Sequence, residues 1–152
     1  MNVRVVDYRA ADAADVESWH DGRTFDAILL DAPCSSTGTT RRHPDVLWTK
    51  DAADIAKLAA LQEKLLRHAV TLLKPGGRLV FSNCSIDPSE GEEIIDRLLV
   101  DFPDLRLLPI APEDWPGLEV AITPKGEFRT TPAMLAEQGG LDGFYAAVVA
   151  KI

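Results

Sequence analysis

Residues 27–38 read AILLDAPCSSTG, an apolar run followed by a polar loop that contains Cys34. Residues 79–85 read LVFSNCS and repeat this construction around Cys84. Short apolar runs that end in polar loops are typical of buried parallel strands. We therefore predict an α/β fold in which each cysteine lies just past the carboxyl end of a strand. In open α/β sheets, ligands bind along that rim.

Composition sets the class of protein. The chain has 152 residues, of which 46% are hydrophobic and 26% charged, as expected for one globular domain over residues 1–152. It has no secretory signal, no apolar run near 18 residues and only two cysteines. These features predict a soluble cytoplasmic protein with no membrane partner.

The two cysteines allow more than one chemistry. Because both follow neighbouring strands, a Cys34–Cys84 disulfide is an alternative to two free thiols. A metal site is not expected, because the cysteines lack the paired spacing of a zinc site. His43 and His68 have no close partner in the sequence that would complete one.

The charge balance bears on nucleic-acid binding. A net charge of −8 is unexpected for a protein that binds RNA, because affinity comes largely from neutralising phosphates. Arg41, Arg42 and His43, with Lys50 nearby, form the basic patch beside the candidate site. A solvated loop is one interpretation. The position directly after the Cys34 segment favours contact with phosphate.

The remaining pattern places helices between the strands. Residues 2–8 predict a strand, and residues 10–19 a short helix or turn. A long amphipathic pattern then predicts a helix capped by Asp51 and stopped by Lys74-Pro75-Gly76-Gly77, with Gln62 as the one polar residue on its apolar face.

The second half of the chain carries a further helix and strand. Ser89-Glu90-Gly91-Glu92 has the form of a capping box that opens a helix ending before Pro103. Glu90 and Glu92 are then first-turn acids favoured by the helix dipole. The remaining segments are a surface connection over 103–117, two short segments (121–124 and 127–130) around a Lys125-Gly126 turn, and a final strand over 144–150.

Several motifs occur together in this chain: DAPCSSTG over 31–38, RRHPD over 41–45, NCS over 83–85 with Pro88 and Glu90, and DGFY over 142–145. They resemble the Sun/Nop family of RNA cytosine-C5 methyltransferases, most closely the RsmB type that acts on bacterial small-subunit ribosomal RNA. The motifs follow the family's order and span the chain from about Asp12 to Lys151. Asn83 departs from the threonine expected before the second cysteine.

The resemblance implies a Rossmann-like class I methyltransferase fold that is truncated at its amino-terminal side. No glycine-rich turn of the kind that holds the methionine end of S-adenosylmethionine precedes Asp31, and the acid for the ribose hydroxyls is also missing. The chain therefore resembles the carboxyl-terminal part of a methyltransferase catalytic domain.

The resemblance also implies roles in catalysis. Cys84 would attack C6 of cytosine and make C5 nucleophilic, while Cys34 would assist removal of the C5 proton or release of the RNA. Asp31 is associated in the family with the cofactor and with the polar edge of the base. The sequence leaves these two roles of Asp31 open.

The cofactor and the RNA are assigned in the same way. Asp12, Asp31 and Pro33 would bind S-adenosylmethionine, with Asp7 and Asp15 as alternatives to Asp12. Arg41, Arg42 and His43 would bind ribosomal RNA.

Three function classes follow from these assignments. The intact protein is expected to be an RNA (cytosine-C5-)-methyltransferase, whereas this chain alone is expected to be inactive. The alternatives are a module that keeps the thiol site but binds cofactor poorly, and a methyltransferase-like domain that serves as an interaction module.

Strand order adds a structural expectation. In the family, the strand that matches residues 3–8 is separated from the one that matches 28–31 by two strands that have no counterpart here. We expect residues 3–8 to pair directly with 28–31 or to detach, or the chain to self-associate through the exposed edge of 28–31.

Overall fold

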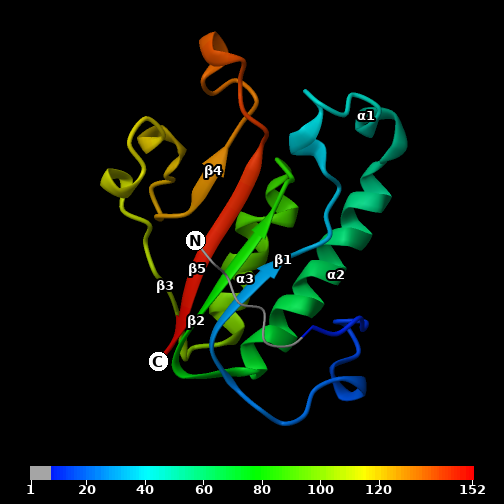
Figure 1. The fold of residues 1–152 in the computed structure, drawn as a ribbon, viewed down its shortest axis with the longest axis vertical. Helices are drawn as coiled ribbons and strands as arrows, with labels where there is room; N and C mark the ends of the chain where they lie inside the picture. Colours follow the sequence, from blue (N-terminus) through cyan, green and yellow to red (C-terminus); the bar gives the residue numbers. More distant parts are fainter. Residues whose placement is uncertain (1–7) are drawn as a thin grey trace.

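The computed structural model describes residues 8–152, which form a five-stranded sheet with helices on one face (Figure 1). The strands are β1 (Phe25–Asp31), β2 (Leu73–Asn83), β3 (Leu105–Leu107), β4 (Phe128–Thr130) and β5 (Phe144–Lys151). Their order is β1-β2-β5-β3, and β4 also pairs with β5. Strands β1 and β2 are parallel, whereas β5 is antiparallel to β2, β3 and β4. The predicted α/β fold is confirmed.

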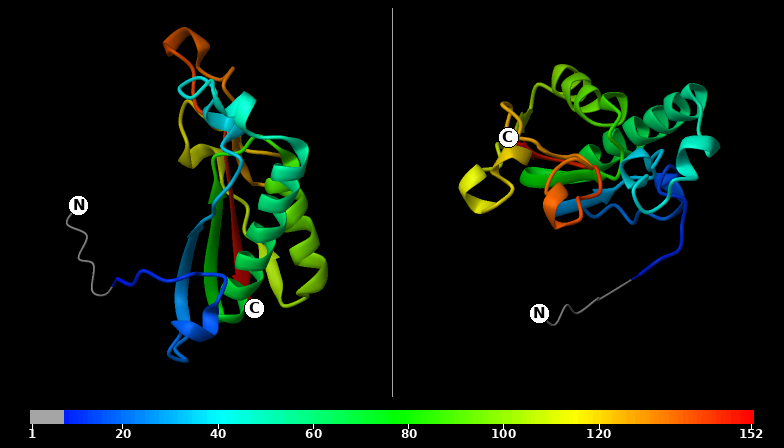
Figure 2. Two further views of the ribbon diagram at one scale, coloured as in Figure 1. Left: turned by 90° about the vertical axis from the view of Figure 1, so that its right-hand side faces the viewer. Right: turned by 90° about the horizontal axis from the view of Figure 1, so that it is seen from above.

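The helices are α1 (Val46–Thr49), α2 (Ala52–Thr71) and α3 (Glu92–Asp101). Both α2 and α3 cover the same face of the sheet (Figure 2). The predicted cap of α2 is confirmed, because the Asp51 carboxylate accepts a hydrogen bond from the backbone N–H of Asp54 at 2.9 Å. Six 3₁₀ turns connect the elements: Val16–Ser18, Thr37–Thr39, Pro88–Glu90, Pro112–Asp114, Glu119–Ala121 and Ala136–Gln138.

The hydrophobic core lies between the sheet and the two long helices. The core residues with no exposed surface come from α2, α3 and the central strands: Leu66, Leu79, Phe81, Ile94, Leu98, Tyr145, Ala147 and Val149. Ile28 and Leu30 of β1 pack against this core. Leu29 points to the other face of β1, where its side chain is 72% exposed.

The pairing of β1 with β2 aligns the ends of the two strands. Leu30 lies opposite Phe81 and Asp31 opposite Ser82, in a parallel register. The loops that carry Cys34 and Cys84 therefore leave the sheet side by side and on the same rim, as predicted.

Two boundaries differ from those predicted. Strand β2 begins at Leu73 rather than Leu79, because the chain pairs with Phe25 as soon as α2 ends. Strand β3 lies inside the segment 103–117, which was expected to be only a surface connection. Its three residues are too few to show a pattern in the sequence, and pairing with β5 makes them a strand.

The predicted capping box at the start of α3 is wrong. Ser89 lies in the turn Pro88–Glu90, and both its backbone N–H and its hydroxyl donate to the Asp87 carboxylate. Helix α3 begins at Glu92 after Gly91, with no side-chain cap. The turn uses the polar residues that would otherwise have capped the helix.

Strand β1 forms one edge of the sheet built by residues 8–152. The strand predicted over 2–8 lies outside the described residues except for Tyr8, which is in no strand. Its pairing with 28–31, and self-association through that edge, therefore stay predictions. Within residues 8–152 no helix is both long enough and apolar enough to cross a membrane.

The core position of Leu66 predicts a large effect on stability. Leu66→Ala should lower the free energy of unfolding by about 2–5 kcal/mol, because it leaves a cavity between α2 and the sheet. Leu47→Ala is the matched control: Leu47 is 65% exposed, and its loss should cost less than about 0.5 kcal/mol. Urea unfolding followed by circular dichroism measures both. Equal costs would contradict this packing.

Candidate functional site

The two cysteines meet at the rim of the sheet. The Sγ atoms of Cys34 and Cys84 are 3.3 Å apart, and both residues are free, half-buried thiols. The Ser36 hydroxyl lies 3.5 Å from the Cys84 sulfur. The structure therefore brings together the two residues predicted to carry the chemistry, without the disulfide that was the alternative.

Close backbone contacts hold the two cysteine loops together. The Gly38 N–H donates to the Cys84 carbonyl at 2.9 Å, and the Gly143 N–H donates to the Gly38 carbonyl at 2.7 Å. A Cβ atom at position 38 would lie 2.0 Å from the Gly143 oxygen and 2.7 Å from that of Cys84. Only glycine fits where these three loops meet.

Ser36 has a strained backbone. Its φ of 59° and ψ of 22° place it in the left-handed region, which non-glycine residues seldom adopt. Such strain persists only when surrounding contacts impose it, and it is concentrated at functional sites. Here it turns the hydroxyl of Ser36 toward the Cys84 sulfur.

A buried carboxylate, that of Glu90, forms hydrogen bonds with the Cys34 loop. Glu90 is 0% exposed and accepts three hydrogen bonds, two from the backbone N–H and hydroxyl of Ser35 and one from the Gln62 amide. The prediction that Glu90 is a first-turn acid of this helix is wrong, because α3 begins at Glu92 and Glu90 lies in the preceding turn with its side chain buried. Glu92 does lie in the first turn of α3, where it pairs with Arg129.

The same network reaches the Cys84 loop. Asn83 donates to the Gln62 side-chain oxygen at 3.1 Å and accepts from the Ser85 N–H at 3.0 Å. Sequence reasoning missed this network. Its one signal was Gln62, the polar residue on the otherwise apolar face of α2.

Asp31 lies at the end of β1, exposed to solvent. One of its carboxylate oxygens accepts from the Ser82 hydroxyl at 3.1 Å. The other accepts no hydrogen bond from residues 8–152, and Pro33 is exposed beside it in the chain. This oxygen of Asp31 therefore lies at the carboxyl end of β1, three residues before Cys34.

Asp12 and Asp15 lie elsewhere. Asp12 accepts from the Ala14 N–H at 2.8 Å, and the Asp12 carbonyl accepts from the Trp19 indole at 3.1 Å. Ala13, Val16 and Trp19 line an apolar cavity together with the last turns of α2 and with four residues of β1, namely Phe25, Ala27, Ile28 and Leu30. The turn Val16–Ser18 lies near the end of the sheet opposite the loop that follows β1 (Figure 1). Asp7 lies outside the described residues.

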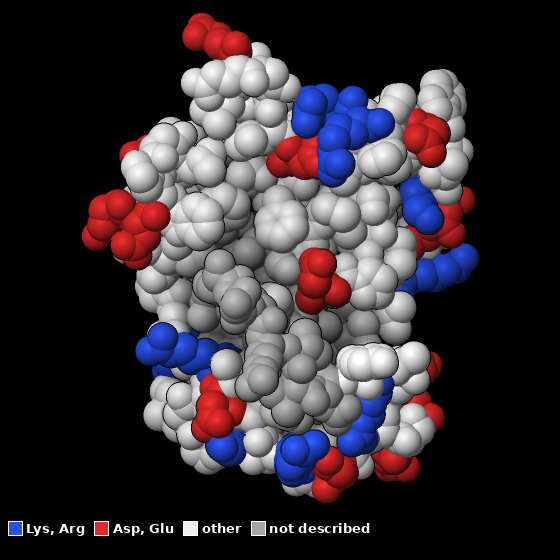
Figure 3. Space-filling model, in the orientation of Figure 1, with Lys and Arg blue, Asp and Glu red and all other residues white. Residues whose placement is uncertain are grey.

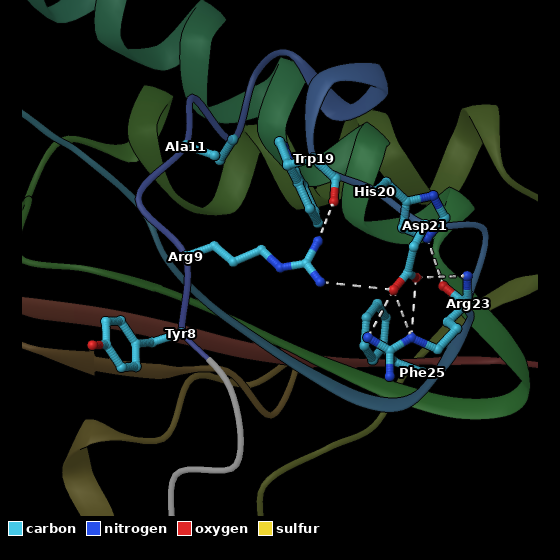
Figure 4. A pocket seen from close by; sticks show the side chains of 9 residues that line it. Tyr8, Arg9, Ala11, Trp19, His20, Asp21, Arg23 and Phe25 are labelled. Atoms are coloured by element: carbon cyan, nitrogen blue, oxygen red, sulfur yellow. Dashed lines mark hydrogen bonds and ion pairs between the residues drawn. The ribbon is translucent and has the colours of Figure 1, made fainter.

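A second cavity, of about 460 Å³, lies beside this segment (Figure 4). Arg9 reaches across it to the Trp19 carbonyl at 2.9 Å and toward the Asp21 carboxylate. Its lining, from Tyr8 to Phe25, contains neither cysteine and not Asp31. The larger of these two cavities is thus separate from the two thiols.

The predicted RNA-binding arginines are paired with an acid. Arg42 and Arg41 both contact the Asp142 carboxylate, Arg41 at 3.5 Å. The hydrogen bond from Arg42 lowers the pKa of Asp142 and raises that of Arg42. Figure 3 shows basic groups clustered near one edge of the molecule with acidic atoms directly beside them. His43 is exposed next to this cluster.

The surroundings of Cys34 affect its protonation. Burial raises the pKa of Cys34 to about 11, and the adjacent Cys84 adds to this effect. Cys34 is therefore a neutral thiol at pH 7. Among residues 8–152, no group of three or more His, Cys, Asp or Glu side chains is placed to hold a metal ion.

Comparison with known proteins supplies the family. The model of the 16S rRNA methyltransferase RsmB/F family matches residues 1–150. The chain belongs to this family. It is 46% identical to Ribosomal RNA small subunit methyltransferase B of Pseudomonas putida over 94% of its own length and 30% of that relative. The chain is 42% identical to the protein of the same name from Vibrio cholerae, over 92% of its own length and 29% of that relative.

Solved structures agree with this membership. A methyltransferase homolog protein from Pyrococcus horikoshii is 30% identical, with a TM-score of 0.70 over 93% of this chain and 43% of that one. NSun6 from the same organism, solved with SFG, has the same fold at 23% identity, with a TM-score of 0.71 over 93% of this chain and 33% of that one.

The chain spans about 30% of the length of the curated relatives it matches. The expectation of a truncated Rossmann-like methyltransferase fold, made from the Sun/Nop motifs, is confirmed.

The contact between Gly38 and its neighbours can be tested in this RsmB/F chain. Gly38→Ala should cost about 2–3 kcal/mol of unfolding free energy, because the new methyl group displaces two carbonyls. It should also change the rate at which Cys84 is alkylated. Gly76→Ala, which meets no atom within 4 Å but has a φ of 77°, should cost about 1 kcal/mol and leave that rate unchanged. Similar alkylation rates in both variants would refute the contact.

The burial of Cys34 predicts an unusual pH dependence. In Cys84→Ser, whose one cysteine is Cys34, the alkylation rate should rise with a midpoint at least about one pH unit above the ordinary thiol value of about 8.5. The fold favours the neutral thiol, so its stabilising contribution is present below about pH 9 and lost as the pH rises through about 11. The same variant unfolded in urea is the control, and an identical midpoint there would rule out the effect.

Proposed function

We propose that the chain supplies the thiol-bearing part of a cytoplasmic enzyme that methylates C5 of cytosine in ribosomal RNA, using S-adenosylmethionine. The observation that carries the proposal is the contact of Cys34 and Cys84 at the ends of two parallel strands, 3.3 Å apart. Membership of the 16S rRNA methyltransferase RsmB/F family supports the RNA substrate.

The chemistry needs two different sulfurs. Cytosine C5 is too weak a nucleophile to accept a methyl group unaided, so the Cys84 thiolate adds to C6 and its electrons reach C5 through the ring. S-adenosylmethionine supplies the methyl group when bound. A base then accepts the C5 proton, the ring electrons return, and the bond from Cys84 to C6 breaks, which restores the Cys84 thiolate. Cys34, whose raised pKa keeps it protonated, would assist this release by donating its proton to the departing Cys84 sulfur rather than compete for C6.

The residues at the rim fit the cofactor in part. The exposed Asp31 carboxylate keeps an oxygen free of hydrogen bonds from residues 8–152, and Pro33 lies two residues further along. The relative NSun6 was solved with SFG, an analogue of S-adenosylmethionine, which supports use of this cofactor. Asp12 joins the proposal through its family motif alone, with Asp7 and Asp15 as alternatives.

Arg41, Arg42 and His43 are proposed to contact RNA phosphates. They lie on the loop that follows Cys34, and Gly140 and Asp142 border them on the other side. Because Asp142 already neutralises part of their charge, phosphate would have to share these arginines with it. RNA binding by this loop should therefore be weak and sensitive to salt.

A second candidate function is a module that keeps the thiols but binds cofactor poorly. The observation that favours it is the position of Asp12, whose neighbours Ala13, Val16 and Trp19 line an apolar cavity that contains neither cysteine and not Asp31. The chain also spans only about 30% of its curated relatives.

RNA containing 5-fluorocytosine distinguishes the two functions. Fluorine at C5 blocks the final elimination, so a functional Cys84 should remain covalently joined to the RNA when S-adenosylmethionine is present. We expect a stable adduct with the wild-type chain and none with Cys84→Ser, measured by denaturing gel and mass spectrometry. An adduct that survives Cys84→Ser but not Cys34→Ser would reverse the two roles.

Two controls interpret a negative result. The full-length Pseudomonas putida relative should form the adduct under the same conditions and so validates the RNA. A titration of the chain with S-adenosylmethionine, followed through the amide shifts of Asp12, Asp31 and Cys34, tests binding separately. No shifts at millimolar ligand, with an adduct only in the relative, would select the cofactor-deficient module.

A further inference from the structure

Glu90 is the one fully buried acid that touches a cysteine loop in residues 8–152. Its two oxygens accept from the N–H of Ser35 at 2.9 Å, from the Ser35 hydroxyl at 2.5 Å and from the Gln62 amide at 2.8 Å. A carboxylate is removed from water only at high cost unless donors replace its hydration. Three donors, two of them from the residue next to Cys34, offset that cost.

Gln62 carries this constraint to the other cysteine. The Ser85 N–H can only donate, so it fixes the Asn83 oxygen toward itself and the Asn83 amide group toward Gln62. The Gln62 oxygen accepts that bond, which leaves the Gln62 amide group to donate to Glu90. Each bond in the chain thus has one permitted direction, and the chain ends on an acceptor.

A second connection joins the loops directly. The Ser85 hydroxyl lies 3.3 Å from that of Ser35 and 3.0 Å from that of Thr37. Asn83 and Ser85, the two residues adjoining Cys84, are therefore tied to Gln62 and Ser35, and Glu90 accepts hydrogen bonds from both of these. One carboxylate is thus connected to both cysteine loops.

We propose that Glu90 is a positioning residue that fixes Cys34 and Cys84 at contact distance. Its importance for methyl transfer rests on the proposed function, because one cytosine must be reached by both sulfurs. The spacing itself does not rest on it. Glu90 touches neither the sulfurs nor a substrate, and acts through Ser35, Gln62 and Asn83.

Disulfide formation between the two thiols reports how close together they are held. With oxidised glutathione as oxidant, the Cys34 and Cys84 thiols become one disulfide and two molecules of glutathione are released. The equilibrium between the two forms gives the effective concentration of one thiol at the other. The fractions of the dithiol and disulfide forms are measured by alkylating the remaining thiols and analysing the protein by mass spectrometry.

The variants separate positioning from general stability. Glu90→Ala removes all three acceptors and should lower the effective concentration at least about tenfold. Glu90→Gln should stay within about threefold of wild type, because its amide oxygen replaces one acceptor and the Ser35 hydroxyl can turn to accept from its amide group. Glu127→Ala is the matched control: Glu127 is also buried, and its bonds go to Tyr145 and Thr123. It should leave the effective concentration within about threefold.

A further variant decides the matter if Glu90→Ala does not fold. Gln62→Met conserves volume but removes the side-chain connection between the Glu90 carboxylate and Asn83, leaving the hydrogen bond of the Asn83 amide to the Glu90 backbone carbonyl, so it should lower the effective concentration at least about threefold. The proposal is overturned if Glu90→Ala or Gln62→Met forms the disulfide as readily as wild type. It is also overturned if Glu127→Ala lowers the effective concentration as much as Glu90→Ala does, or if the wild-type thiols form no disulfide.

The disulfide measurement needs neither cofactor nor RNA, so its outcome is independent of the proposed function. If disulfide formation depended on Glu90 in a protein that never forms an adduct with 5-fluorocytosine RNA, the methyltransferase role would be refuted and the positioning role kept. If Glu90→Ala formed both the disulfide and the covalent adduct with 5-fluorocytosine RNA as readily as wild type, the methyltransferase role would be kept and the positioning role refuted.

Discussion

The parallel pairing of β1 with β2 is the constraint on which the site depends. Asp31 lies opposite Ser82, and the two cysteine loops begin within two residues of this pair. A slip of one residue would turn every side chain of β1 to the other face, burying Leu29 and exposing Ile28 and Leu30. The core between α2 and the sheet therefore fixes the register, and the register brings the two sulfurs together.

Pairing of the strands aligns the loops but does not determine their inner geometry. That geometry comes from polar contacts at the carboxyl rim, where Glu90 binds the Cys34 loop and the backbone of Gly38 contacts the Cys84 loop. A polar network in a core is costly unless every member is satisfied, and here each donor has an acceptor. The strained backbone of Ser36 shows that these contacts are strong enough to impose an unfavourable conformation.

The sequence predicted what depends on local pattern. Apolar runs gave the strands that precede Cys34 and Cys84, and Asp51 marked the start of α2. It misassigned Glu90, because the local pattern around it also fits a capping box, and only the packing of α2 against the turn reveals its burial. Asp142 was seen as part of a motif, but its pairing with the arginines spans about a hundred residues, beyond any local signal.

The surroundings of Cys34 bear on the role proposed for it. Burial raises the pKa of the Cys34 thiol, and the Cys84 sulfur 3.3 Å away adds to this effect. A thiol that keeps its proton cannot attack C6, but it can donate that proton to a departing sulfur. The environment of Cys34 therefore supports a role that follows the attack, and this agrees with the proposal that Cys84 is the nucleophile.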